Sequence, residues 1–258
     1  MTPYQLWTAY YTIVRKDIVR ITRIWPQTFL PSLITSTLYF MVFGQVLGSR
    51  IGDVGGHPYM QFVVPGLVML AVVTNSFSNV ATAFFQSKFF IRSIDEILVS
   101  PTPPWLLVLG FISGGIVRGV AVGLLVMLVS LFFALPAVPH PFMVLVFLLL
   151  SSALFALGGL INGIYAKSFD GITIIPTFVL TPLVYLGGVF YSVQSLPVWA
   201  QHVTQLNPIF YLINGFRYGL LGHSDVSIAT CVAVLSAMVA VFAGIGWYQI
   251  KHGLGLKQ

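Results

Sequence analysis

The stretch FMVLVFLLLSSALFALGGLINGI at residues 142–164 decides the fold class, because it contains no charged side chain over its whole length. A helix needs about 20 apolar residues to cross a hydrocarbon core roughly 30 Å thick. The stretch is long enough for one crossing, and we expect a transmembrane helix here.

Similar apolar runs lie on both sides of it, and we place the other spans at 27–48, 61–85, 108–134, 172–192 and 228–250. Only 7% of the 258 residues are charged, against about 25% in soluble proteins. We predict an all-α integral membrane fold with six transmembrane helices, in which 1–258 form a single transmembrane domain and 27–250 hold the spans. A short skimming segment inside 104–134 is an alternative for the start of the third span.

Residues 1–25 show an amphipathic pattern that differs from the spans. Aromatic and aliphatic side chains recur at alternating spacings of four and three, beside a basic stripe on another face. The apolar members are Trp7, Tyr11, Val14, Ile18, Ile21 and Trp25, and the basic ones are Lys16, Arg20 and Arg23. This pattern favours a helix lying on an anionic lipid surface, which Pro26 stops or kinks. A solvated helix packed on a partner is the alternative.

Basic residues are distributed unevenly between the connections. One set of alternate segments carries nine of them: Arg15, Lys16, Arg20, Arg23, Lys88, Arg92, Lys167, Lys251 and Lys257. The opposite set carries only Arg50 and Arg217. Because basic residues favour the cytoplasmic side, we expect a multi-pass protein with both termini in the cytoplasm, which requires an even number of spans.

The connection 193–227 is apolar, yet Pro197 and Pro208 interrupt it. It is too apolar for a solvated loop and too broken for a span. We predict a pair of helices that dip partway into the outer leaflet. In the preceding span, Pro176 and Pro182 predict kinks.

The third span contains an arginine among glycines. Gly115, Gly119 and Gly123 stand four residues apart, which predicts close helix packing. Arg118 is costly inside a membrane, and we expect its side chain to reach the headgroups at the cytoplasmic end. A role in the transport pathway is the alternative.

The sequence lacks the motifs of several chemistries. No glycine is followed by lysine, so no Gly-x-x-x-x-Gly-Lys-Ser/Thr phosphate loop exists. The five histidines are scattered, and we expect no metal site. The six acidic residues lie outside the predicted spans: Asp17, Asp53, Asp95, Glu96, Asp170 and Asp225. Carriers driven by protons or sodium usually need a buried carboxylate, so we expect the energy to come from a partner.

One loop between the second and third spans is suited to receive that energy. Ser93 and Glu96 stand at capping-box spacing, so a helix is expected to begin at Ile94 and to end by Pro101. Its apolar face and two carboxylates are typical of a plug for a cytoplasmic partner. An ordinary capped loop helix is the alternative.

The C-terminal third carries a pattern of apolar and turn residues: Leu180, Leu183, Leu186, Gly187, Val189, Leu196, Pro197, Pro208, Ile209, Tyr211 and Arg217. In these residues and their spacing the chain resembles the membrane subunit of ABC exporters of the type-2 permease family. The stretch YMQFVVPG at 59–66 is similar to that of short bacterial permeases encoded beside an ATPase. Gly187, Pro197, Pro208, Tyr211 and Arg217 are the signature of the resemblance.

The resemblance implies a homodimer in the bacterial inner membrane, joined by two copies of a separate ATP-binding subunit that would hold ATP and Mg. The chain itself would bind no cofactor, catalyse no reaction and contact membrane lipid but no nucleic acid. Residues 1–25 would form a connecting helix. The contact to the ATPase would involve Arg92, Ser93, Ile94, Asp95, Glu96 and Leu98.

The implied function is export of an amphipathic, lipid-like, drug or saccharide substrate along a path between the two protomers. Our candidates for lining it are Tyr39, Phe40, Tyr185, Phe190 and Tyr191; ordinary packing or interface aromatics are the alternative for each.

Two other classes of function remain open on the sequence. An ion-gradient-driven secondary transporter or channel would need an acidic residue inside a span. A membrane-embedded enzyme acting on lipid would need a polar cluster at one membrane depth, and none is evident from the sequence.

Overall fold

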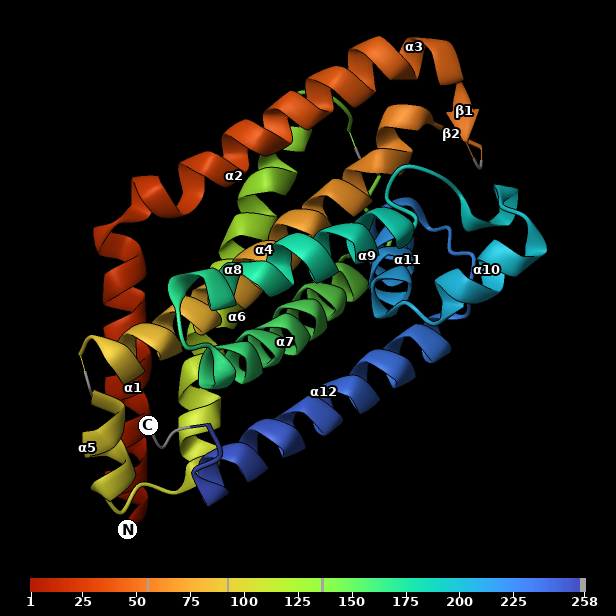
Figure 1. The fold of residues 1–258 in the computed structure, drawn as a ribbon. Coiled ribbons are helices and arrows are strands. Elements are labelled where there is room, and N and C mark those ends of the chain that lie inside the picture. Colours follow the sequence, from red (N-terminus) through yellow and green to blue (C-terminus); the bar gives the residue numbers. More distant parts are fainter. Residues whose placement is uncertain (55, 92, 136, 256–258) are drawn as a thin grey trace.

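The computed structural model describes residues 1–54, 56–91, 93–135 and 137–255, and these are almost entirely helical (Figure 1). Among them, five helical runs are long and apolar enough to cross a membrane: α4 (Tyr59–Phe89), α6 (Pro104–Ser130), α7 (Pro141–Tyr165), the run Phe169–Leu186 and α12 (Ile228–His252). Each coincides with a predicted span. The all-α membrane fold is therefore confirmed.

The first predicted span is a chain of three helical segments. They are α2 (Trp25–Phe40), the π-helical η1 (Met41–Leu47) and α3 (Gly48–Ile51). None alone reaches membrane length, but they follow one another without a break, so their sum agrees with a sixth crossing. A short hairpin then leads into α4. Its strands have two residues each, and β1 (Asp53–Val54) pairs antiparallel with β2 (His57–Pro58).

The fifth span is also interrupted. It consists of α8 (Phe169–Ile175), the π-helical η2 (Pro176–Leu180) and α9 (Thr181–Leu186). Pro176 has no N–H for the helical ladder, and the hydroxyl of Thr181 donates to its carbonyl oxygen at 3.0 Å. The helix ends at Leu186 rather than at the predicted residue 192, because Gly188 turns the chain with φ +85°.

The centre of the molecule is formed by α4 and α7, with α6 packed against both. A side chain at Gly159 of α7 would overlap the carbonyl oxygen of Phe77 in α4, so the two backbones meet directly. On α6, Gly115 faces Val80 and Ala156 in the same manner. The close packing predicted from the glycine series is confirmed. The helix α6 begins at Pro104 without a separate skimming segment and ends at Ser130, four residues before the predicted 134.

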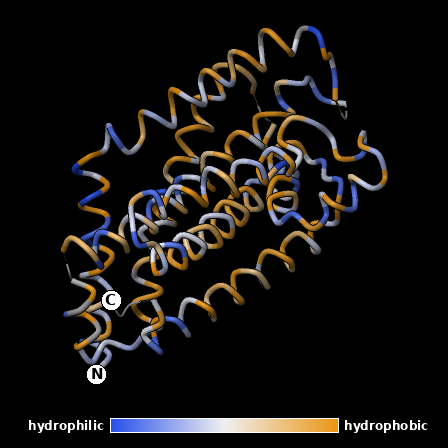
Figure 2. Tube along the Cα trace, in the orientation of Figure 1, coloured by the Kyte–Doolittle hydropathy of each residue, from blue (hydrophilic) through white to orange (hydrophobic). Residues whose placement is uncertain are grey.

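The start of α1 (Pro3–Arg23) and the end of α12 lie at the same end of the molecule as α5 (Ser93–Val99), which agrees with an even number of crossings (Figure 1). Figure 2 shows hydrophobic residues along α12 and the central helices, and hydrophilic residues toward helix ends and on α1 (Pro3–Arg23). At the terminal end, the ammonium of Lys88 donates to the carbonyl oxygens of Ile164 at 3.0 Å and Gly255 at 2.5 Å. Lys88 thus ties α4 to the end of α7 and to the C-terminal segment.

Candidate functional site

The predicted plug is the short helix α5, which confirms the helix expected there. Arg92 lies outside the described residues, as do the side chains of Ser93, Asp95 and Leu98. Ile94 is 1% exposed and packs with Phe84 and Leu107 in the core between α4, α6 and α7. Glu96 is exposed, and so is Val99, at 89%. The helix therefore has an inner face anchored in the bundle and an outer face open to a partner.

Three of the five aromatic residues proposed for the path lie together. The hydroxyls of Tyr39 in α2 and Tyr185 in α9 are 3.3 Å apart, and the ring of Tyr185 lies 5.7 Å from that of Phe190. Phe43, which the sequence did not single out, stacks on Phe190 with 4.3 Å between ring centroids. The hydroxyl of Tyr59 donates to the carbonyl oxygen of Phe190 at 3.2 Å. This aromatic cluster joins the first, second and fifth spans.

The other two aromatic candidates point elsewhere. Phe40 is fully buried and packs against Phe133 with centroids 5.6 Å apart, so it faces the interior of the protomer. Phe40 follows Tyr39 directly in α2, and successive helical residues point about 100° apart. Because Tyr39 faces the aromatic cluster, Phe40 is turned toward the interior of the protomer. Tyr191 donates its hydroxyl to the carbonyl of Leu186 and closes the turn after α9. We leave Phe40 out of the proposed path.

The signature residues assemble where α9 meets the outer helices η3 (Val193–Ser195), α10 (Val198–Gln205) and α11 (Pro208–Leu221). Gly187 ends α9 and lies against Ile209, Pro197 precedes α10, and Pro208 opens α11. The hydroxyl of Tyr211 donates to the carbonyl of Gln205 at 2.8 Å. These residues shape the connection between helices rather than line an opening.

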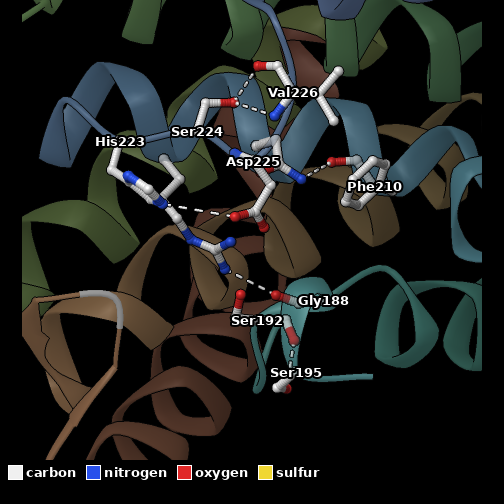
Figure 3. A network of polar contacts seen from close by, with 10 residues as sticks. Gly188, Ser192, Ser195, Phe210, His223, Ser224, Asp225 and Val226 are labelled. Atoms are coloured by element: carbon white, nitrogen blue, oxygen red, sulfur yellow. Dashed lines mark hydrogen bonds and ion pairs between the residues drawn. The ribbon is translucent and has the colours of Figure 1, made fainter. Parts of the chain in front are cut away.

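Arg217 is the centre of this outer region, although the sequence analysis only counted it among the basic residues of the outer connections. Its side chain is 1% exposed and lies 3.8 Å from the ring centroid of Phe62. Its Nη2 donates to the carbonyl oxygen of Gly188 at 2.8 Å. Asp225 lies nearby, with an oxygen 3.6 Å from the imidazole of His223 (Figure 3). We call Arg217, Gly188 and Phe62 the outer clamp.

The predicted pair of outer helices is present, but burial in protein accounts for the apolar sequence of the second. Most of α11 is buried, and it packs against α4, α7 and α12. Gly215 lies directly against the ring of Phe147 in α7, where a side chain would overlap it. A helix inside the bundle needs the same composition as one in lipid, so the sequence alone could not separate the two cases.

The N-terminal helix α1 packs lengthwise on α6. Thr2 and Gln5 form a capping box at its start, and the chain turns at Ile24 into α2. The hydroxyls of Tyr10 and Ser113 lie 2.9 Å apart, and Ile13 packs against Gly110. The contact face is thus displaced from the predicted apolar stripe, of which the large aromatics are exposed: Trp7, Tyr11 and Trp25.

A buried polar cluster joins α1 to α4 and α6, and it is the main feature that the sequence did not reveal. The carboxylate of Asp17 pairs with Arg20 and accepts from the amide of Asn79 at 3.0 Å. Asn79 Oδ1 accepts from Arg20 at 2.9 Å and, at 3.5 Å, from Arg118. Arg118 also donates to Asn75 Oδ1 at 3.1 Å. The expectation that Arg118 reaches the headgroups is wrong, because two asparagines of α4 hold its guanidinium.

Two features of the sequence could have indicated this inner cluster (Asp17, Arg20, Asn75, Asn79 and Arg118). The two asparagines stand four residues apart in an apolar run, so they share one face of α4. Asp17 and Arg20 are also one turn apart. What no pattern specified is that α1 would place its carboxylate against α6, at the small surface of Gly114.

Within the described residues, no group of three or more His, Cys, Asp or Glu side chains is placed to hold a metal ion. The only described cysteine, Cys231, is buried in α12. The structure therefore offers no metal centre among these residues.

Comparisons with known proteins agree with this architecture. The family model described as ABC-2 type transporter matches residues 8–221. The chain is 50% identical to the inner membrane transport permease YadH of Escherichia coli (strain K12), over 97% of this chain and 98% of the relative. It is 26% identical to nodulation protein J of Rhizobium meliloti (strain 1021), over 82% and 81% of the two chains, and 24% identical to nodulation protein J of Neorhizobium galegae, over 84% and 82%.

Proposed function

Because the chain belongs to the ABC-2 type transporter family, we propose that it is the membrane subunit of an ATP-driven exporter whose ATPase is a separate chain. The shared family and the near full-length similarity to an inner membrane transport permease support a multi-pass location in a bacterial inner membrane. The cargo in this proposal is amphipathic: a lipid-like molecule, a drug or a saccharide.

The observation that carries the ATPase contact is the two-faced geometry of α5. Ile94 is anchored in the core, while Glu96 and Val99 face outward. A partner pressing on the outer face would move α5 against the ends of α4 and α6 as a nearly rigid body. Two protomers and two ATPase subunits complete the proposed assembly, with both termini in the cytoplasm.

The path in this proposal runs between two protomers and is lined by the aromatic cluster. Tyr39 and Tyr185 are partly exposed, on helices that present much of their apolar surface outside the protomer. Aromatic faces suit apolar tails and stacked sugars alike, so the cluster supports the class of cargo without selecting one member.

The first test replaces Glu96 with Ala and measures, in proteoliposomes with the cognate ATPase, the stimulation of ATP hydrolysis. We expect a clear loss of stimulation at unchanged folded yield. Asp53→Ala is the matched control, since Asp53 is an exposed acid in β1 at the opposite end of the molecule. Equal activity of the Glu96 and Asp53 variants would argue against coupling through α5.

The second test separates the exporter from an ion-gradient-driven secondary transporter or channel. In the same proteoliposomes, transport is compared with ATP and no gradient, and with a proton or sodium gradient and no nucleotide. The exporter requires ATP. Transport driven by the gradient alone would contradict it.

A further inference from the structure

We propose that Lys88 is a positioning residue for coupling: with the turn at 253–255 it forms a brace that passes a displacement of α5 on to α7 and α12. The inference rests on the proposed function, in which the ATPase presses on α5. Lys88 lies in the last turn of α4, five residues before α5 begins, and is 6% exposed. Its ammonium donates to the carbonyl oxygens of Ile164 at 3.0 Å and Gly255 at 2.5 Å.

The ammonium of Lys88 is held by groups that belong to other parts of the chain. Ile164 is the last residue but one of α7, so the helix itself leaves its carbonyl without a partner. The negative end of a helix dipole also favours a cation at this place. Burying an ammonium is costly unless it is hydrogen-bonded. The end of α4 is therefore expected to move together with the end of α7 and the turn at 253–255.

The turn after α12 is built to bring a carbonyl to this position. The N–H groups of Gly253 and Leu254 donate back into the end of α12 in the Schellman arrangement. Gly253 and Gly255 have φ values of +66° and +71°, which a side chain disfavours. A methyl group at Gly255 would lie 3.0 Å from Cγ2 of Ile164 and 3.2 Å from its carbonyl oxygen. The turn thus folds back closely onto the end of α7.

The helix α5 is linked to the brace in two ways. The N–H groups of Phe90 and Ile91 continue the hydrogen bonding of α4 beyond its last residue, so the chain stays wound almost to the start of α5. On its inner face, α5 shares one cluster of buried apolar side chains with α7 and α12. The shared members are Ile94 of α5, Ile164 of α7 and Ile250 of α12. Little of α12 is buried in the protomer, so it can shift as one rod when α5 moves.

The experiment is hydrogen exchange, read by mass spectrometry, on the chain in nanodiscs with its cognate ATPase. Exchange is compared without nucleotide and with a non-hydrolysable ATP analogue and Mg²⁺. We expect the nucleotide to change exchange in wild type both at α5 and at residues 249–255. In Lys88→Met, which keeps the length but cannot donate, the change at α5 is expected to remain and the change at 249–255 to disappear. Without nucleotide, the N–H groups of Gly253 and Leu254 should exchange about tenfold faster in this variant.

The matched control for the charge is Lys251→Met, because Lys251 is exposed in the last turn of α12, with its ammonium over the ring of Trp247. It is expected to leave both nucleotide responses in place. Gly255→Ala attacks the brace from its other side and should give the same loss as Lys88→Met. Its control is Gly52→Ala, which has a similar strained φ of +76° but open space around it.

The outcomes separate the brace from the proposed function. A wild-type response confined to α5 would overturn the brace and leave coupling through α5 standing. A full response at 249–255 in Lys88→Met would overturn it as well. No nucleotide response at α5, or no complex with the ATPase, would overturn the proposed function and the brace with it. Variants are compared at equal folded yield and equal ATPase content. If Lys88→Met does not fold, Gly255→Ala decides the question.

Discussion

A buried arginine stands in each of two polar regions of the molecule, and the two are held differently. In the outer clamp, Arg217 donates to a backbone carbonyl, that of Gly188, and lies over the ring of Phe62. In the inner cluster, Arg118 is bonded to side-chain amides, and one of these also serves Arg20 of α1. A backbone partner stays in place when a neighbour is changed. A shared side chain does not, so each member of the inner cluster depends on the others.

The largest effect is expected from Gly114→Ala, which attacks the inner cluster without touching a polar group. The new methyl would overlap the carboxylate of Asp17 and force it away from Arg20 and Asn79. Arg20 would then remain without its carboxylate, and breaking a buried pair costs roughly 3–5 kcal/mol. We expect a fall in Tm of about 10 °C in detergent, measured by thermal unfolding.

The matched control is Gly244→Ala in α12, where a methyl group would meet nothing within 4 Å. It makes the same change in an exposed helix and is expected to leave Tm unchanged or slightly higher. If the Gly114→Ala and Gly244→Ala variants have the same Tm, then Asp17 is not held against α6 as it is in the structure.

The outer clamp is tested by Arg217→Lys. A lysine keeps the charge but loses the planar guanidinium that lies over the ring of Phe62 while it donates to Gly188. We expect a loss of about 2 kcal/mol, smaller than for the inner cluster because the partner carbonyl and ring stay in place. Hydrogen exchange would locate the change: faster exchange confined to α11 and the turn after α9 supports the clamp, and faster exchange in α1 contradicts it.

The membrane architecture was predictable because lipid imposes long uncharged runs, and five of these runs coincide with helical runs of membrane-spanning length in the described residues. The helix at α5 was predictable from a local capping pattern. The partners of Arg118 and Arg217 were not, because they lie on other segments of the chain, far away in sequence. Arg217 and Lys88 show most clearly what the sequence pattern could not predict. Both were counted among the basic residues of the connections between spans, and both are buried in the structure.

The ends of interrupted helices were predicted less well than those of continuous ones. From hydropathy we predicted that the fifth span extends to residue 192. In the structure the helix ends at Leu186, because the two glycines that follow turn the chain. The same error placed Phe190 inside a span, whereas it lies in the turn beyond it and stacks on Phe43. Hydropathy reports the surroundings of a residue, and backbone turns depend on a few local positions.

A third link between distant segments is weaker than either arginine site, and it probes the proposed path. The hydroxyls of Tyr39 and Tyr185 are 3.3 Å apart in a partly exposed position. Removing one by Tyr39→Phe or Tyr185→Phe should cost only about 0.5 kcal/mol, and the double variant should cost no more than either single one. Thermal unfolding of the four proteins measures this coupling. Transport by the same variants then decides their role: a change in transport several times larger than the stability effect would place the pair on the path, whereas a change that only follows folded yield would make it a packing contact.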